Sequence, residues 1–260
     1  MKYIIFDIDG TLTNTKKVDD KCFIKAFEKT FGINIENEKW EAIKHVTDWG
    51  ITEEIFLREV GRKPYQAEYD LMLSNHVQLL KEEEQKDKTQ FAEINGAKVF
   101  FEKLSCTKDI KLGIATGAWE QSANLKLEAI GIDTKDICFS NSDYHKTREN
   151  ITKDVIRQLN QKTNQTPETI IYFGDGEWDF KTCNNLGIHF IGIDVDNNDK
   201  LKKLGATTIF NNFLKSEDIL NVISCFADVK LKNENITFCL AKQSSHADFA
   251  DSRRFTQIFH

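Results

Sequence analysis

The stretch Ile4-Ile5-Phe6-Asp7-Ile8-Asp9-Gly10-Thr11-Leu12 decides the fold prediction. An apolar run ends in two carboxylates that are two residues apart, so Asp7 and Asp9 can leave a strand on the same side. Gly10 then allows the chain to turn sharply away. Open α/β sheets bind ligands beyond the carboxyl ends of their strands, where this pair would lie. The alternative is a pair of aspartates that only form a turn and cap a helix.

Further apolar runs of strand length follow along the chain, and helical patterns separate them. Their near-continuous apolar character is typical of parallel strands that are covered on both faces. Strands that alternate with helices predict an α/β fold, with a doubly wound parallel sheet. The five predicted strands are residues 2–8, 111–116, 136–140, 169–174 and 188–193.

The connection after the first strand is too long for a loop that joins a strand to a helix. We therefore expect an inserted, all-helical cap domain over residues 15–94, with a small core of its own. The α/β core domain would then comprise residues 1–14 and 95–226. Helical patterning inside the insert covers residues 22–32, 40–46, 51–60 and 69–80.

Two segments do not fit the alternation of strands and helices. The polar run Lys81–Lys88 is expected to be either the solvated end of a helix or the return linker. After a helix near Glu217–Phe226, residues 227–260 form a C-terminal extension whose role is unknown. It could be a packed extension, an interaction segment or a frayed tail.

The composition excludes several classes of protein. The chain has 260 residues, 40% hydrophobic and 29% charged, which is typical of soluble globular domains. Its 35 Lys+Arg against 41 Asp+Glu give a net charge of −6, which argues against nucleic acid as a partner. No apolar run approaches the ~20 residues that span a bilayer, and Asp7 interrupts the N-terminal run. We therefore expect a cytoplasmic protein without a membrane partner.

The cysteines are scattered and lack the spacing of a metal site or of a CxxC motif. We expect them to be reduced, buried side chains. They are Cys22, Cys106, Cys138, Cys183, Cys225 and Cys239.

Polar residues also follow the other predicted strands, at the same edge of the sheet as Asp7 and Asp9. Crowded carboxylates repel one another and raise one another's pKa, so a divalent cation and a basic side chain would be needed among them. Ligation by oxygen atoms alone is typical of Mg²⁺. The hypothesis fails if the carboxyl groups of Asp7 and Asp175 lie well over ~10 Å apart, because no single ion could bridge that distance. The polar residues are Thr116, Gly117, Lys146, Arg148, Asp175 and Asp179.

This set of motifs resembles that of the haloacid dehalogenase superfamily of phosphohydrolases, over roughly residues 1–225. The inserted helices resemble the cap of its phosphoglycolate-phosphatase-like and β-phosphoglucomutase-like members. The matching motifs are Asp7-Ile8-Asp9-Gly10-Thr11, then Thr116, then Lys146 or Arg148, and finally Gly174-Asp175 with Asp179.

The resemblance implies a role for each of these residues. Asp7 would be the nucleophile that becomes an aspartyl phosphate, and Asp9 would be the acid and base that serves the leaving group and water. Mg²⁺ would be held by Asp7, by the backbone carbonyl of Asp9 and by Asp175, with Asp179 in support. Thr116 and Gly117 would bind phosphoryl oxygens beside the third-motif cation. Relatives that use other chemistries lack an acid at the position of Asp9, which favours phosphate esters.

Two assignments stay open. The usual Lys-Pro pair of the third motif is absent, and the R-x-x-I spacing slightly favours Arg148 over Lys146. In the cap, residues 45–51 resemble the specificity loop of the family, which would place Thr47 and Asp48 at the substrate. The alternative is an ordinary turn in which Asp48 caps the next helix.

The expected function is Mg²⁺-dependent hydrolysis of a small phosphorylated metabolite, such as phosphoglycolate, a sugar phosphate or a nucleotide 5′-monophosphate. The alternatives are a phosphomutase that acts on a sugar phosphate, a phosphoprotein phosphatase and a non-catalytic binding protein. The chain would act as a monomer or a homodimer.

Overall fold

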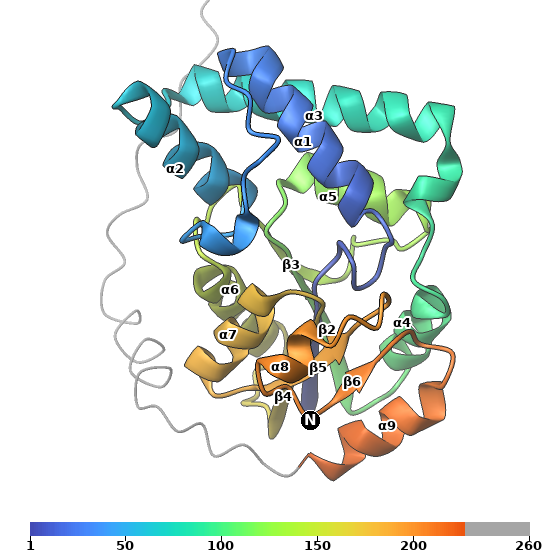
Figure 1. Ribbon diagram of the computed structural model, residues 1–260. Coiled ribbons are helices and arrows are strands. Elements are labelled where there is room, and N and C mark those ends of the chain that lie inside the picture. Colours follow the sequence, from blue (N-terminus) through green and yellow to red (C-terminus); the bar gives the residue numbers. More distant parts are fainter. Residues whose placement is uncertain (227–260) are drawn as a thin grey trace, which may run out of the picture. The chain divides into compact units, whose positions relative to one another are not determined.

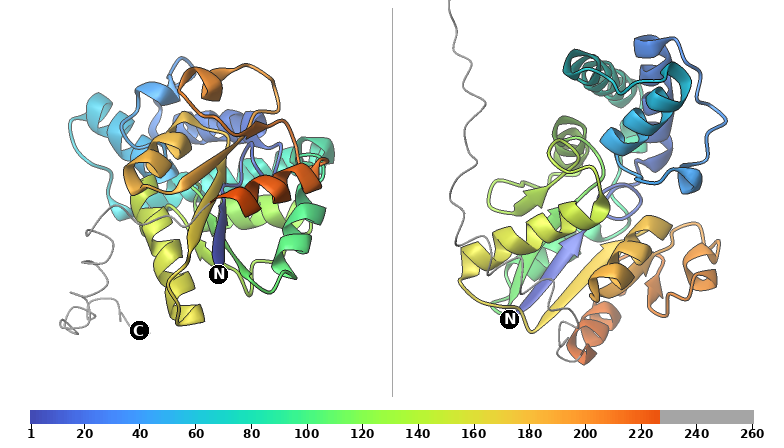
Figure 2. Two further views of the ribbon diagram at one scale, coloured as in Figure 1. Left: turned by 90° about the horizontal axis from the view of Figure 1, so that it is seen from below. Right: turned by 90° about the vertical axis from the view of Figure 1, so that its left-hand side faces the viewer.

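A six-stranded parallel sheet organises residues 1–226, which are the residues that the computed structural model describes. The strand order is β3-β2-β1-β4-β5-β6, and helices cover both faces of the sheet (Figures 1 and 2). The predicted α/β fold is therefore confirmed. The strands are β1 (Lys2–Phe6), β2 (Ile110–Ala115), β3 (Cys138–Ser140), β4 (Thr169–Gly174), β5 (His189–Ile193) and β6 (Ile209–Phe210).

The strand β1 lies in the middle of the sheet because its residues from Tyr3 to Phe6 are apolar on both faces and fully buried. It pairs with β2 on one side and with β4 on the other, so that Phe6 is level with Ile114 and with Phe173. The strand order changes direction at β1, and such a switch point opens a crevice at the carboxyl ends of the strands. Residues that follow these three strands are therefore brought together.

The predicted strand bounds agree with the observed ones to within two residues, and those of β4 agree fully. The sequence did not indicate β6, because Ile209–Phe210 is too short to produce a pattern. The predicted helix over residues 40–46 is wrong. Only the single 3₁₀ turn η1 (Trp40–Ala42) forms there, since the apolar spacing at Trp40, Ile43 and Val46 comes from irregular chain that packs on the neighbouring helices.

Three helices fill the long connection after β1, and they lie beyond the carboxyl ends of the strands (Figure 1). They are α1 (Lys16–Phe31), α2 (Asp48–Val60) and α3 (Gln66–Lys86). Their apolar faces form a cluster around Phe27, Ile55 and Met72 that is separate from the core under the sheet. The division into a cap and a core stays a prediction, since the described residues group into one compact unit.

The remaining helices lie between the strands or follow the last of them. Residues 81–86 of the polar run form the last turns of α3, which agrees with the first of the two interpretations of that run. The C-terminal extension, residues 227–260, lies outside the described residues. The elements between strands are η2 (Lys88–Phe91), α4 (Ala97–Ser105), α5 (Glu120–Ala129), α6 (Arg148–Thr163), α7 (Glu177–Leu186) and α8 (Lys200–Lys203), and α9 (Ser216–Cys225) follows β6.

The cysteines only partly follow the expectation that all are buried. Cys22, Cys138 and Cys183 are buried, and no disulfide forms among the cysteines of residues 1–226. Cys106 and Cys225 are exposed, because each lies at the C-terminal end of a surface helix. Cys239 lies outside the described residues. None of the helices in the described part of the chain has the length and apolar character needed to cross a membrane.

Candidate active site

The ends of three neighbouring strands place residues of three predicted motifs at one edge of the sheet. Asp7 directly follows β1, and its backbone N–H donates to the carbonyl of Phe173 at 2.9 Å. Asp175 directly follows β4, and Thr116 directly follows β2. The parallel register therefore brings together residues that are more than a hundred positions apart in the chain.

The carboxylates of Asp7, Asp175 and Asp179 converge. One oxygen atom from each lies within 4.8 Å of the others, well inside the limit that the hypothesis requires. Asp179 is in the first turn of α7, where its Oδ2 accepts from the N–H of Gly176 at 3.1 Å. Gly10 makes room for this cluster, because it has a φ of 79° and a Cβ atom there would lie 2.4 Å from Oδ2 of Asp175.

Two basic side chains contact the cluster. Nη1 of Arg148 lies 3.1 Å from Oδ1 of Asp7 and 3.3 Å from Oδ1 of Asp179. Nζ of Lys16, at the start of α1, lies 2.6 Å from Oδ2 of Asp175. Arg148 also donates from Nε to the carbonyl of Val46, which fixes its side chain.

Burial dominates the acidity of these groups. It raises the pKa of Asp7 to about 6, against the opposite effect of Arg148, and the neighbouring Asp175 adds to the rise. Burial also raises the pKa of Asp179, with a further contribution from Asp7. Burial alone would lower the pKa of Arg148, but Asp7 and Asp179 raise it above its ordinary value. An additional cation at this edge would therefore stabilise the ionised carboxylates.

Asp9 follows Asp7 at the edge of the pocket, but its carboxylate belongs to a different set of contacts. Its Oδ1 accepts from the hydroxyl of Thr15 at 2.5 Å, and its Oδ2 accepts from Nζ of Lys126 at 2.6 Å. The carboxylates that lie within reach of a common ion are those of Asp7, Asp175 and Asp179. The side chain of Asp9 is therefore not one of the converging carboxylates and is held by Thr15 and Lys126 instead.

The second motif lies next to Arg148. Thr116 is buried, and its hydroxyl accepts from the N–H of Ala118 at 3.2 Å. A Cβ atom on Gly117 would lie 2.5 Å from Nη2 of Arg148, so the close approach of this guanidinium requires glycine. Gly117 and Ala118 line the pocket, whereas Thr116 is not among its lining residues.

The loop before α2 is attached to the core next to the site. Thr47 is the N-cap of α2, since its hydroxyl oxygen accepts from the N–H of Gly50, and it donates to the carbonyl of Lys146 at 2.8 Å. Asp48 donates from its N–H to Gly117 and accepts from the N–H of Trp119 at its Oδ2. Thr47, and not Asp48, therefore caps the helix, and both residues line the pocket.

The structure separates the two candidates for the third-motif cation. Arg148 lies at Asp7 and Asp179, whereas Nζ of Lys146 lies 2.5 Å from Oε1 of Glu53 on α2. Lys146 is not among the residues that line the pocket. Of the two candidates, Arg148 is therefore the one that contacts the carboxylate cluster and lines the pocket.

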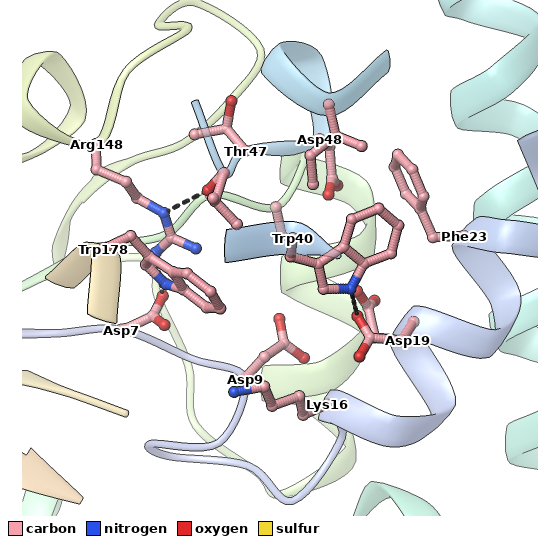
Figure 3. A pocket seen from close by; sticks show the side chains of 15 residues that line it. Asp7, Asp9, Lys16, Asp19, Phe23, Trp40, Thr47, Asp48, Arg148 and Trp178 are labelled. Carbon is pink, nitrogen blue, oxygen red and sulfur yellow. Dashed lines mark hydrogen bonds and ion pairs between the residues drawn. The ribbon is translucent and has the colours of Figure 1, made fainter. Parts of the chain in front are cut away.

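The pocket lies between the sheet edge and the inserted helices (Figure 3). Its walls enclose about 570 Å³ of space that no atom fills, part of which is open to solvent. Asp7 and Arg148 point toward each other near Trp178, while Trp40, Asp19 and Phe23 lie across the pocket from them. The space is therefore bounded by a charged side at the sheet and a partly aromatic side from the insert.

Several residues at or behind the pocket were not indicated by the sequence. Lys16, Asp19 and Asp20 come from the first turns of α1, and their proximity to the first motif was the available signal. Trp178 stands between the two acids of the fourth motif, but a lone aromatic residue carries no specific signal. The unpredicted residues are Lys16, Asp19, Asp20, Phe23, Trp40, Lys126 and Trp178.

Asp48 gives a prediction about stability. Burial raises its pKa to about 7, against the effect of His76, and Asp19 adds to the rise. The unfolded chain loses this proton near pH 4 and the folded chain only near pH 7, so ionisation favours the unfolded state as the pH rises between these values. Asn cannot ionise, so the midpoint of thermal unfolding of Asp48→Asn should rise relative to that of the natural chain as the pH increases from 4 to 8. Thermal unfolding in EDTA measures this difference.

The exposed Asp70, which accepts only from the side chain of Gln66, supplies the control. The difference between Asp70→Asn and the natural chain in the midpoint of thermal unfolding should not grow with pH as it does for Asp48→Asn. A difference between Asp48→Asn and the natural chain that stays constant from pH 4 to pH 8 would contradict the raised pKa.

Comparisons with known proteins agree with this geometry. A hydrolase from Pseudomonas syringae has a TM-score of 0.66 at 21% identity, over 88% of this chain and 100% of that one. A protein described as a predicted phosphoglycolate phosphatase from Haemophilus somnus has a TM-score of 0.59 at 16% identity, over 86% and 98%. A β-phosphoglucomutase from Clostridium difficile has a TM-score of 0.61 at 22% identity, over 84% and 95%. At these identities the likeness shows the fold.

A comparison with curated proteins finds no match. The sequence profile of the haloacid dehalogenase-like hydrolases, however, matches residues 4–193, which span β1 to β5 and include all four motifs. The resemblance drawn from the motifs is therefore confirmed, and the chain belongs to the haloacid dehalogenase-like hydrolase family.

Proposed function

We propose that the chain is a Mg²⁺-dependent phosphatase that hydrolyses a small phosphomonoester through an aspartyl phosphate on Asp7. One observation carries this proposal. The carboxylates of Asp7, Asp175 and Asp179 lie within 4.8 Å of one another beside a pocket that Asp7 and Arg148 line, and Arg148 contacts both Asp7 and Asp179. Family membership supports hydrolysis, and the metal and the substrate are our inference.

The residues present fit Mg²⁺. The donor set consists of oxygen atoms alone, which is the ligation that Mg²⁺ prefers. Lys16 contacts Asp175, and burial raises the pKa of Asp7 and of Asp179 although Arg148 contacts both, so a further cation would favour their ionised forms. Asp7, Asp175 and the backbone carbonyl of Asp9 would hold the ion, with Asp179 in support. When bound, Mg²⁺ would offset the negative charge of the phosphoryl group.

Different residues of the chain would act as the nucleophile, as the acid and base, and as ligands of the phosphoryl oxygens. An oxygen of Asp7 forms the bond to phosphorus as the bond from phosphorus to the leaving oxygen breaks, and Asp9 gives that oxygen a proton. In the second half, Asp9 takes a proton from water as the water oxygen forms a bond to phosphorus, and the bond from phosphorus to the oxygen of Asp7 breaks, which releases phosphate. Arg148 and the backbone at Gly117 and Ala118 orient the phosphoryl oxygens.

The walls of the pocket favour a compact substrate. Trp40, Val46, Thr47 and Asp48 of the insert line it together with residues of the sheet edge. Such a cover leaves little space for a phosphorylated peptide chain, so it argues against a phosphoprotein phosphatase. Phosphoglycolate, a sugar phosphate and a nucleotide 5′-monophosphate are the candidates.

Phosphate release from a panel of small phosphomonoesters tests the proposal. We expect turnover with Mg²⁺ and none with EDTA. Mg²⁺ at a hundredfold excess over its Kd should also raise the midpoint of thermal unfolding by about 5–10 °C, because it binds only the folded chain. Asp175→Asn should abolish both effects.

Asp196→Asn, in an exposed acidic loop, is the matched control and should keep both effects. Activity that persists in EDTA would contradict the proposal, as would a Mg²⁺ shift that survives in Asp175→Asn. Interconversion of sugar phosphate isomers without release of phosphate would indicate a phosphomutase instead. A chain that binds phosphomonoesters without turnover would be a binding protein.

A further inference from the structure

Lys126 is a buried charge to which the proposed reaction gives no role. Among residues 1–226 it is the only buried lysine, and none of its side chain is exposed. It extends from α5 to Asp9 and Asp19, two carboxylates that line the pocket. A buried ammonium is costly unless its partners are well placed, so these contacts indicate its purpose.

Each oxygen of the Asp9 carboxylate has its own hydrogen-bond donor. Nζ of Lys126 donates to Oδ2 at 2.6 Å, and the hydroxyl of Thr15 donates to Oδ1 at 2.5 Å. Donors on both oxygens fix the plane of a carboxylate as well as its position. Asp9 is therefore held in one orientation at the edge of the pocket.

Asp19 gives Lys126 a second carboxylate partner. Nζ of Lys126 lies 2.7 Å from Oδ1 of Asp19, and Nε2 of His76 lies 3.4 Å from the same oxygen. The ammonium group of Lys126 is therefore fixed between two carboxylates, one of which is that of Asp9.

We infer that Lys126 is a positioning residue that holds the carboxyl group of Asp9 where it exchanges a proton with the substrate. The inference depends on the proposed function, in which the proton of Asp9 moves to the leaving oxygen while phosphorus transfers to Asp7. Lys126 is not among the residues that line the pocket, so it acts through Asp9.

A comparison of substrates with different leaving groups can test whether Lys126 positions Asp9. Loss of Lys126 leaves Asp9 with a single anchor, and a displacement of about 1 Å can cost about a hundredfold in rate. An alkyl phosphate needs the proton of Asp9 because an alkoxide is a poor leaving group. A nitrophenyl phosphate needs that proton much less, since nitrophenolate leaves without it. A purely structural lysine would instead affect both esters by the same factor.

The experiment compares kcat/KM for glycerol phosphate and for p-nitrophenyl phosphate, both with Mg²⁺, because kcat/KM reports the transfer to Asp7. We expect Lys126→Met to lose about a hundredfold on the alkyl ester and less than about tenfold on the aryl ester. Asp9→Asn should show the same dependence on the leaving group, and Lys126→Arg should recover part of the alkyl activity. Lys21→Met removes a lysine that pairs with Glu83 at 2.7 Å between α1 and α3, and it should keep both activities.

A second variant keeps the test valid if Lys126→Met folds poorly. Lys126→Met combined with Asp19→Asn removes the buried cation together with one of its counterions, so it should fold and still lose the alkyl activity preferentially. Equal losses on both esters, or recovery of the alkyl activity in the double variant, would overturn the inference. A natural chain that hydrolyses neither ester would contradict the proposed function instead.

Discussion

Asp7→Asn is expected to lower kcat for phosphate release by at least about 10⁴-fold, the largest effect of any single substitution in this chain. The amide has nearly the shape of the carboxylate but cannot attack phosphorus, so the covalent route closes. Stability should not fall, because burial already disfavours the ionised carboxylate and raises the pKa of Asp7 to about 6. Phosphate release at saturating substrate and thermal unfolding at pH 7 measure the two effects.

Asp133→Asn is the matched control, since Asp133 is exposed and accepts only from the N–H of Lys135 in a surface turn. It should retain full activity. If Asp7→Asn folds normally and keeps more than about a tenth of the activity, Asp7 is not the nucleophile.

The α/β core could be predicted from the sequence because the central strands β1 and β4 are covered on both faces. The residues of β4, for example, are all buried, so the strand appears as an unbroken apolar run. Once β1 and β4 are known to be parallel neighbours, the convergence of Asp7 and Asp175 follows from the topology alone. The irregular chain at Trp40 could not be predicted, because its apolar residues pack against the helices of the insert with a spacing that happens to resemble a helix.

The choice between Lys146 and Arg148 could not be made from the sequence either. The two residues are only two positions apart, around the first residue of α6, and this small offset determines which acidic partner each one contacts. Arg148 is the first residue of the helix and faces Asp7, whereas Lys146 precedes the N-cap and reaches Glu53 on the insert. Only the path of the chain before the helix separates these directions.

The contact of Lys126 with Asp9 and Asp19 was beyond sequence reasoning for a different reason. Lys126 lies in the helix α5, and a lysine in a helix is normally interpreted as part of the solvated face. Its burial depends on α1, which belongs to the insert and supplies Asp19. A contact that requires two separately placed elements leaves no local pattern in the sequence.

Arg148→Met should have the second largest effect, on stability as well as on activity. Arg148 is the cation between Asp7 and Asp179, whose side chains are 3% and 0% exposed. Its loss leaves two buried carboxylates facing each other, which should lower the free energy of unfolding by about 3–5 kcal/mol. It also removes a charge that stabilises the transferring phosphoryl group, for which a loss of about 10²–10³ in kcat is expected. Urea unfolding in EDTA and steady-state kinetics with Mg²⁺ measure the two losses.

Arg157→Met provides the comparison on the same helix, because Arg157 is exposed and pairs only with Asp154 and Gln161. It should change the free energy of unfolding by less than about 0.5 kcal/mol. If the loss in Arg148→Met arises from repulsion between Asp7 and Asp179, then adding Asp179→Asn should restore much of the stability but not the activity. Equal stability losses in Arg148→Met and Arg157→Met would show that Arg148 does not neutralise the carboxylate cluster.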